Sequence, residues 1–475
     1  MNTHASTEHR YNALFGTRVR FFVLILILLC LSSIWSNILA INFVMICMDP
    51  IVNGTEAENY DKHHITPTEY QWYLSIVAIA ALSSNFFAVY LSDRIGVRTV
   101  FTTLGLLSAV STALMPMAIR NGFWAIMVVR FFQGVSFSVN YAVIGAFCAK
   151  WAYFKQVGLL VSVLVAYVQL SPVITMSISG PICTSSLGWP AVFYFHSVAT
   201  FFLFVFYGFF YRNSPQKHPF VGTIEKSKIA VGKVVVNKAE RAQPPYLDII
   251  RTPAVWAVWG GAVANFGAVN LMLSFSPIYL SRVLGFTINK TGFSAALPPL
   301  LQFIAKVIVG IVSDRMTCLS ETNKLRFFNS VAMYCCGGCF CLLGFLGTEH
   351  PTINMLVLGA AAGFLGMDTG GFFKAGPIIS RQYSHIVTGV FSIVLTGMML
   401  IVPMAVNAIL DDHMTIDRWQ RVFTGCAACM IIISTVFCIF IRGEPAWWTK
   451  EEPKKTENVN MKEDAKVENG IQGRF

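Results

Sequence analysis

Charged residues are scarce in this chain: 12% of its 475 residues are Asp, Glu, Lys or Arg, whereas 55% are apolar. This composition leaves too little polar surface for several water-soluble domains, so we exclude a soluble multidomain protein. Acidic residues are scarcer than basic ones, and the formal net charge is +11. The bases lie in short connections and form no basic domain. They indicate orientation in a membrane and contact with anionic lipid, and they argue against nucleic-acid binding.

Two classes of catalytic motif are also absent. The chain has no glycine-rich phosphate loop followed by lysine and no nucleophile elbow, so we predict neither an ATP-driven pump nor an enzyme. Closely spaced cysteines such as Cys336 and Cys339 lie in apolar runs without histidine. They indicate small packing residues, and we expect no metal and no cofactor. Cys47 and Cys183 both fall near the predicted outer face, where they could form a disulfide, but sequence does not show them adjacent.

Apolar runs of spanning length recur and predict twelve transmembrane helices in an all-α polytopic membrane protein. The first six runs are 19–48, 71–91, 99–119, 123–149, 157–179 and 190–211, and the second six are 253–280, 292–312, 327–347, 352–379, 387–410 and 420–441. We expect a cytosolic N-terminus (1–18), an N-terminal six-helix bundle (19–211), a basic cytosolic linker (212–252), a C-terminal six-helix bundle (253–442) and a disordered cytosolic tail (443–475).

Basic residues mark one side of the predicted membrane. They precede the first span, follow the second and fourth spans, and are frequent after the sixth. These connections are therefore predicted to be cytosolic, and with an even number of spans both termini are cytosolic as well. The opposite connections are acidic or neutral. Two N-glycosylation sequons, at Asn53 and Asn289, fall on the predicted outer side and agree with this orientation.

A short Asp-Arg signature follows the second span and recurs after the eighth. The first copy contains Asp93, Arg94 and Arg98, and the second contains Asp314 and Arg315. An acid followed by arginine at a cytosolic helix end can bridge to a neighbouring helix terminus when that side closes and release it when the side opens. We therefore predict a gating role for both copies. Their recurrence indicates the major facilitator fold, two six-helix bundles around a central cavity.

Longer strings occur in a specific order: RFFQG at 130–134, KWA at 150–152, GWPAVFY at 188–194 and SPQKHP at 214–219. The second half adds Gly371-Phe372, the 383–389 connection, Trp419-Gln420 and Gly443-Glu444. Together these strings resemble the family of vesicular glutamate transporters, sialin and sodium-phosphate cotransporters within the major facilitator superfamily. The resemblance implies proton- or sodium-coupled movement of organic anions or phosphate.

The chain departs from this family at charged positions. By the family pattern, arginines are expected where this sequence has Ala40 and Gly267-Ala268, a glutamate where it has Phe137, and a histidine in the second span, which contains none. Losing two arginines removes counter-charges for a dianion, and losing the glutamate removes a proton carrier. Arg130 is the charge of this set that remains, so we expect a surviving anion site to prefer monoanions.

Candidate substrate-binding residues are Arg130, Lys374 and three polar residues within the spans, Asn42, Tyr141 and Asn265. A charge or amide in an apolar span is costly unless it faces a cavity or a partner. Two alternatives stay open. Arg130 can extend along its helix to the membrane surface, and the polar residues can serve as interhelical hydrogen bonds.

Two further charges lie inside predicted spans. Asp368 is near the middle of the tenth span, and Lys306 is about two turns inside the eighth. They form either a coupling device or an ion pair that only holds helices together. A direct pair between Asp368 and Lys374 is disfavoured, because positions six apart fall on different faces of a helix.

The pattern as a whole favours a secondary transporter or facilitator that moves a small solute by alternating access. We expect an organic anion or a phosphate-like anion as substrate and a proton or sodium ion as coupling ion. The alternative is a transport-inactive relative that acts as a membrane sensor or binds a partner protein. The multi-pass chain is expected in the plasma membrane or an intracellular vesicle membrane, in contact with lipid and not with nucleic acid.

Overall fold

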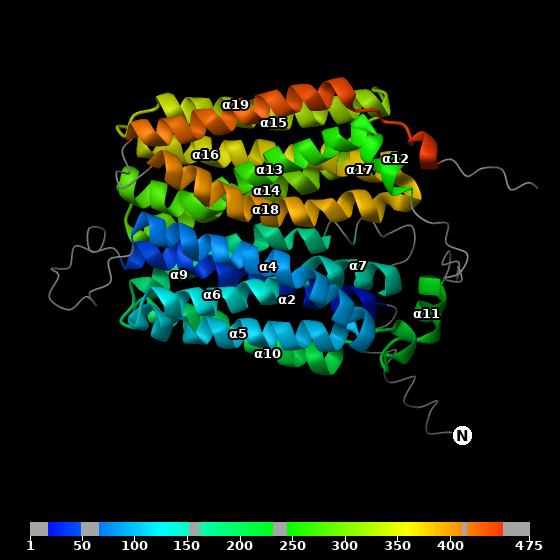
Figure 1. Ribbon diagram of the computed structural model, residues 1–475, viewed down its shortest axis with the longest axis horizontal. Helices are drawn as coiled ribbons and strands as arrows, with labels where there is room; N and C mark the ends of the chain where they lie inside the picture. The colour runs from blue at the N-terminus through cyan, green and yellow to red at the C-terminus, as the bar shows by residue number, and fades with distance from the viewer. Residues whose placement is uncertain are drawn as a thin grey trace, which may run out of the picture.

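The computed structural model describes residues 18–48, 66–151, 160, 163–230, 245–410 and 416–449. Within these ranges all regular secondary structure is α, 3-10 or π helix. The long helices run roughly parallel in two stacked groups, the earlier half of the chain below and the later half above in Figure 1. The predicted all-α architecture is confirmed.

Seven helices build the spans of the N-terminal half. They are α2 (Val19–Cys47), α4 (Pro67–Ile95), α5 (Val97–Asn121), α6 (Phe123–Phe137), α7 (Asn140–Trp151), α9 (Tyr167–Cys183) and α10 (Pro190–Phe210). Local chemistry sets several boundaries. Thr66 and Glu69 form a reciprocal capping box at the start of α4, and Gly96 and Gly122 adopt φ values of 91° and 94° between helices.

The remaining elements form the connection and the C-terminal half. They are η3 (Pro215–Lys217), α11 (Thr223–Ala230), α12 (Tyr246–Arg251), α13 (Pro253–Ile278), η5 (Tyr279–Val283), α14 (Ile288–Arg315), α15 (Glu321–Phe345), α16 (Pro351–Leu365), η6 (Gly366–Gly370), α17 (Phe372–Ser380), η7 (Arg381–Tyr383), α18 (Ser384–Leu410), α19 (Ile416–Phe440) and η8 (Trp447–Thr449).

Twelve helical segments of the described chain are long and apolar enough to cross a membrane, and they match the twelve predicted spans. Two spans differ from the continuous helices that we expected. The fourth breaks between Phe137 and Asn140, where Ser138 Oγ donates to Val135 O over 2.7 Å and competes with the helical pattern. The tenth is interrupted by the 3-10 turn η6.

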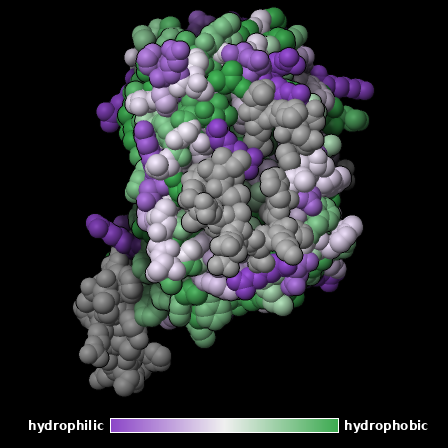
Figure 2. All heavy atoms as spheres, turned by 90° about the vertical axis from the view of Figure 1, so that its left-hand side faces the viewer, coloured by the Kyte–Doolittle hydropathy of each residue, from purple (hydrophilic) through white to green (hydrophobic). Residues whose placement is uncertain are grey.

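Apolar side chains cover the sides of the bundle. Phe86, Phe87 and Trp124 are exposed by 82%, 72% and 78%. Figure 2 looks onto the end at the left of Figure 1 and shows hydrophilic residues in patches over this end, with hydrophobic residues among them and around the outline. A belt of apolar side chains between polar ends is what a bilayer requires of a multi-pass protein.

Close helix contacts depend on the small residues that the sequence places on α6. A Cβ atom added to Gly134 would come within 2.8 Å of Ala80 Cβ on α4 and closer still to Val77 O. Only glycine therefore permits this approach of α6 to α4. The contact positions the neighbouring Arg130 against both α2 and α4.

Cys47 and Cys183 form a disulfide that joins the ends of α2 and α9, with the two Cα atoms 6.1 Å apart. We call this end of the molecule the disulfide end and the opposite end, where α11 and α12 lie, the linker end. Several hydrogen bonds join the two halves near the disulfide end. They are Tyr70 Oη to Ser274 O (3.2 Å), Asn407 Nδ2 to Gln71 Oε1 (2.7 Å) and Thr184 Oγ1 to Asn289 Oδ1 (3.1 Å).

The segment between the halves docks on each half separately. Helix α11 brings the buried Glu225 to the start of α2, where its carboxylate accepts hydrogen bonds from Val19 N over 3.3 Å and Arg20 N over 3.0 Å. These are backbone donors that a helix start leaves without an intrahelical partner. Helix α12 leads instead into α13, with Trp256 Nε1 donating to Ile250 O over 2.7 Å.

His218 packs in an aromatic cluster beside α10. Its ring lies 5.4 Å from that of Trp151 and 5.0 Å from that of Phe210, between centroids. Burial lowers the pKa of His218 to about 4, although its hydrogen-bond contact with Phe210 O opposes the shift. The imidazole is therefore neutral at pH 7.

The tail begins later than the sequence suggested. Residues 443–449, expected to be disordered, pack against the C-terminal half, and Trp448 Nε1 donates to Thr252 Oγ1 over 2.9 Å. The prediction was wrong for these seven residues because it rested on the absence of periodicity. A tryptophan can be held by one hydrogen bond and ring packing, here against Tyr383 at 5.9 Å.

Candidate functional site

Asp368 is the centre of a polar cluster in the C-terminal half. It lies on η6 within the tenth span, and its side chain is fully buried. Asn265 Nδ2 on α13 donates to Asp368 Oδ2 over 2.6 Å, whereas Oδ1 has no hydrogen-bond partner in the described chain. The structure thus brings together two residues that the sequence assigned to separate tasks, substrate binding and coupling.

Two glycines allow the turn η6, which carries Asp368, to pack closely against α14 and α15. A Cβ on Gly366 would lie 2.6 Å from Ala305 Cβ on α14, and one on Gly370 would lie 2.7 Å from Phe328 on α15. Side chains at these positions would push η6 away from both helices. The backbone break and the buried carboxylate are therefore parts of one packed arrangement.

Lys306 lies on α14 beside the same cluster. Its Nζ atom is 5.3 Å from the centroid of the Phe373 ring, a cation–π contact. Lys306 is close enough to Asp368 for their charges to interact, but in the described chain no ion pair within 4.0 Å joins them. A positive and a negative side chain are thus near neighbours without being bonded.

Lys374, the other candidate lysine, reaches the last turn of α14. Its Nζ atom donates to Ser313 Oγ over 3.2 Å and lies 3.5 Å from Ser313 O. A cation is favoured there because the last carbonyls of a helix carry partial negative charge. Lys374 therefore lies next to the second Asp-Arg copy.

Arg130 is fully enclosed in the N-terminal half. Its Nε donates to Tyr73 O over 2.9 Å, and its Nη1 donates to Ile38 O and to Gln133 Oε1, both over 2.9 Å. Gln133 Nε2 continues the network to Thr112 Oγ1 over 2.9 Å. The side chain is 0% exposed, so it does not extend along its helix to the surface. It ties α6 to α2 and α4.

A second group of polar atoms in the N-terminal half lacks partners. Asn140 begins α7 at the break in the fourth span and lies beside Tyr167 on α9; within the described chain neither its side-chain amide nor the Tyr167 hydroxyl forms a hydrogen bond of good geometry. Tyr141 lies beside Tyr167 and is partly buried. Asn42 on α2 is 1% exposed, and its Oδ1 is likewise unpaired. Buried polar atoms normally have partners, so this group is a candidate for contact with water or a solute.

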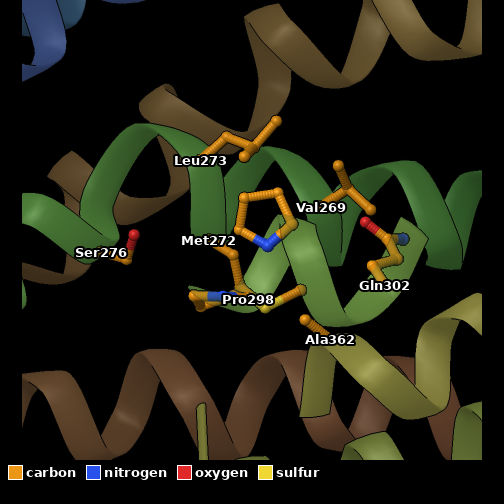
Figure 3. A pocket seen from close by; sticks show the side chains of 8 residues that line it. Val269, Met272, Leu273, Ser276, Pro298, Gln302 and Ala362 are labelled. Atoms are coloured by element: carbon orange, nitrogen blue, oxygen red, sulfur yellow. The ribbon is translucent and has the colours of Figure 1, made fainter. Parts of the chain in front are cut away.

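The halves meet in the membrane interior through two glutamines. Gln169 Nε2 on α9 donates to Gln302 Oε1 on α14 over 3.4 Å. Beside this contact lies a small pocket, which Figure 3 shows between α13, α14 and α16. It is lined by Val269, Met272, Leu273, Ser276, Pro298, Pro299, Gln302 and Ala362.

Known proteins with this sequence pattern are membrane transporters. Residues 21–403 match the family described as Major Facilitator Superfamily. The chain belongs to this superfamily. This chain is 27% identical to vesicular glutamate transporter 3 of Danio rerio over 437 residues, which cover 86% of this chain and 70% of the relative. It is 26% identical to sialin of Homo sapiens over 409 residues, 81% of the transporter and 79% of the relative.

A solved structure gives the same fold. A bacterial homologue of the human lysosomal transporter Spinster, in an inward-facing and unoccupied conformation, superposes with a TM-score of 0.61 at 13% identity, covering 88% of the transporter and 95% of that chain. The predicted resemblance to the vesicular glutamate transporter and sialin family and the predicted major facilitator fold are both confirmed. The transporter is a multi-pass membrane protein, not an enzyme.

The Asp-Arg copies of the transporter lie at the linker end. In the first, Arg98 N donates to Asn213 Oδ1 over 2.9 Å and Arg98 Nε donates to Gly208 O over 2.8 Å, while the Arg94 guanidinium lies 5.3 Å from the Tyr90 ring centroid. These contacts stay within the N-terminal half. In the second, Arg315 is exposed. The side chains of Asp93 and Asp314 lie outside the described residues, so gating stays a prediction.

The sequence analysis did not single out Asn140 or Tyr167, and it did not connect the glycines around Asp368 with the placement of its carboxylate. The signal was present: an asparagine in the middle of an apolar span, and five glycines between Gly359 and Gly371. Of the two sequons, Asn53 lies outside the described residues. Asn289 is exposed in the first turn of α14 and accepts the hydrogen bond from Thr184. Glycosylation of either remains a prediction.

Proposed function

We propose that this chain is a secondary active transporter that moves a small organic or phosphate-like anion by alternating access. Three features support the proposal. The fold is that of transporters, two spans break where polar residues lie, and the relatives are named vesicular glutamate transporter and sialin. Broken helices near the middle of a span are tolerated beside protein or water, which is where transporters bind solutes.

The observation that carries the proposal is the half-satisfied carboxylate of Asp368. Within the described spans it is the acidic residue placed near mid-span, since Glu69, Asp93, Asp314, Glu321 and Asp417 stand in the first or last turns of their helices. A buried charge with one oxygen unpaired is costly. A transport-inactive relative would gain nothing from a buried carboxylate that destabilises the fold. The presence of Asp368 therefore favours an active transporter over the sensor alternative.

The contacts between the halves support a state that is closed on the outer side. The hydrogen bonds of Tyr70, Asn407 and Thr184 gather at the disulfide end. Disulfides persist in oxidising compartments, so this end is the extracytosolic one in the proposal, and both termini are cytosolic. The basic connections of the sequence agree with this orientation.

The proposed substrate site lies between the unpaired amides of the N-terminal half and the cluster around Asn265. Asn42, Tyr141 and Asn265 contribute polar contacts, and Lys306 supplies the positive charge for an anion. Arg130 and Lys374, which the sequence proposed as ligands, already bond to protein groups. In the proposal Arg130 positions Asn42, because it holds the carbonyl of Ile38 one turn earlier on α2.

Uptake into proteoliposomes tests the function. A panel of phosphate, organic monoanions, dianions and neutral solutes is offered with and without proton and sodium gradients. We expect concentrative uptake of at least one monoanion under one of the gradients, and a loss of that uptake in Lys306→Ala. No uptake of any solute by folded protein would favour the transport-inactive alternative.

A further inference from the structure

We infer that Asp368 is the proton-carrying group of this transporter. When the proton leaves, Lys306 is the cation that neutralises the Asp368 carboxylate. The inference rests on the proposed function and names its coupling ion and coupling residue. It also places the coupling site in the C-terminal half, whereas the family pattern puts a glutamate at the position of Phe137 in the N-terminal half. Here the Phe137 ring lies 5.0 Å from that of Trp35 and fills that space with apolar surface.

The first step of the argument is the geometry of the carboxylate. Asn265 donates to Oδ2 only, and the packing of η6 against α14 and α15 holds the carboxylate away from water. Oδ1 is left as a buried acceptor without a donor. A proton on Oδ1 removes the buried negative charge, which is the larger cost, without any movement of Asn265.

The second step concerns the charged neighbours. Among the described residues, the titratable groups that face Asp368 are Lys306 from α14 and the Cys336 thiol from α15. Helix α13 presents the neutral amide of Asn265, α16 contains no titratable residue, and Lys374 of α17 donates to Ser313. Lys306 is therefore the charged side chain placed to replace a proton. Its present contact with the Phe373 ring shows a position that it can hold without bonding the carboxylate.

The third step links proton and anion. With the proton on Oδ1, Lys306 has no carboxylate to neutralise and its charge is available to an anion. Without the proton, Lys306 closes on Asp368 and the anion loses its counter-charge. Binding of either one therefore favours binding of the other. In each cycle a proton from outer water reaches Oδ1, crosses with the anion and passes to cytosolic water as Nζ approaches.

Proton binding can be measured without knowing the substrate. Purified protein in proteoliposomes on a solid-supported membrane is exposed to rapid pH jumps, and the transient current reports protons entering the site. We expect a transient in the unmodified protein, its loss in Asp368→Asn, and in Lys306→Ala a midpoint moved to higher pH by about one unit or more, since a nearby positive charge opposes protonation. The loss of the infrared band of a protonated carboxyl group in Asp368→Asn gives a second readout.

The matched control is Glu225→Gln, which neutralises another buried carboxylate, one whose two oxygens are both hydrogen-bonded at the linker end. It should keep the transient. A transient that persists in Asp368→Asn, or one that follows sodium jumps and not pH jumps, would overturn the inference even if the solute panel shows uptake. A transient that requires Asp368, with no solute transported, would uphold proton binding while the proposed function fails.

Discussion

The two halves of this transporter each bury an ionic side chain and surround it differently. In the N-terminal half, Arg130 is bonded to two backbone carbonyls and a glutamine amide, and its helix contacts α4 through Gly134. In the C-terminal half, Asp368 receives one hydrogen bond and has a lysine nearby that does not pair with it. A satisfied charge stabilises one arrangement of helices. A half-satisfied charge leaves room for a second arrangement, which a transport cycle needs.

The same contrast explains why the family's remaining arginine is poorly placed as a ligand. Its Nε and Nη1 donors already serve Tyr73, Ile38 and Gln133, and the side chain is fully buried. The Asp368 site has no such obstacle. We therefore interpret the N-terminal charge as structural and the C-terminal charge as functional. Three experiments test that division, and a fourth tests how the linker docks on the N-terminal half.

The largest effect on stability is expected at Arg130. Arg130→Met removes the hydrogen bonds to Ile38 O and Tyr73 O and leaves Gln133 Oε1 without its donor, which should cost on the order of 2–4 kcal/mol. Arg130→Lys should recover only part of this, because an ammonium cannot reproduce the planar fork. Thermal unfolding in detergent measures both. Near-normal melting of Arg130→Met would mean that the network is not structural.

A smaller loss of stability is expected when a substitution moves η6 away from α14. Gly366→Ala adds a methyl group against Ala305, which should cost about 1–3 kcal/mol and displace the carboxylate of Asp368. The matched control is Gly363→Ala one turn earlier, where the nearest atom, Leu301 Cβ, would be 3.9 Å away. We expect the first variant to lose uptake and stability and the second to keep both. Equal behaviour of the two would show that the close packing of η6 is unimportant.

A local effect of pH is expected at His218. Because the pKa is about 4 in the folded protein and about 6.5 when the histidine is exposed, acid favours the undocked linker. Docking should be constant above pH 6.5 and weaken as the pH falls from there toward 4. Proteolysis of the linker over a pH series measures this. His218→Phe keeps the ring packing and should cleave at a rate independent of pH in this window.

The smallest stability change is expected for Asp368→Asn. The new amide can accept the hydrogen bond from Asn265 through its oxygen, and the variant removes a buried charge, so melting should change by no more than about 1 kcal/mol in either direction. Coupled uptake should nevertheless be lost. A large destabilisation together with the lost uptake would assign Asp368 to the same structural class as Arg130.

Much of the fold was predictable because hydrophobic runs and basic connections are local properties of the sequence. The twelve spans and the repeated Asp-Arg copies follow from them directly. The partners of Arg130 were not predictable, since backbone carbonyls on other helices leave no trace in residue identity. For the same reason the sequence left open whether Asp368 and Lys306 form a closed ion pair, and it did not foresee that Lys374 reaches Ser313. The sequence also left open whether Cys47 pairs with Cys183, because only the structure brings the two cysteines together.

The contact of Glu225 with the start of α2 has a consequence for biosynthesis. The backbone amides of Val19 and Arg20 leave the ribosome early. The Glu225 carboxylate that accepts their hydrogen bonds follows about two hundred residues later, after all six spans of the N-terminal half. Until then, the beginning of the first helix depends on water or lipid headgroups for these bonds. Arrival of α11 therefore marks the point at which the first half is complete, before any span of the second half has entered the membrane.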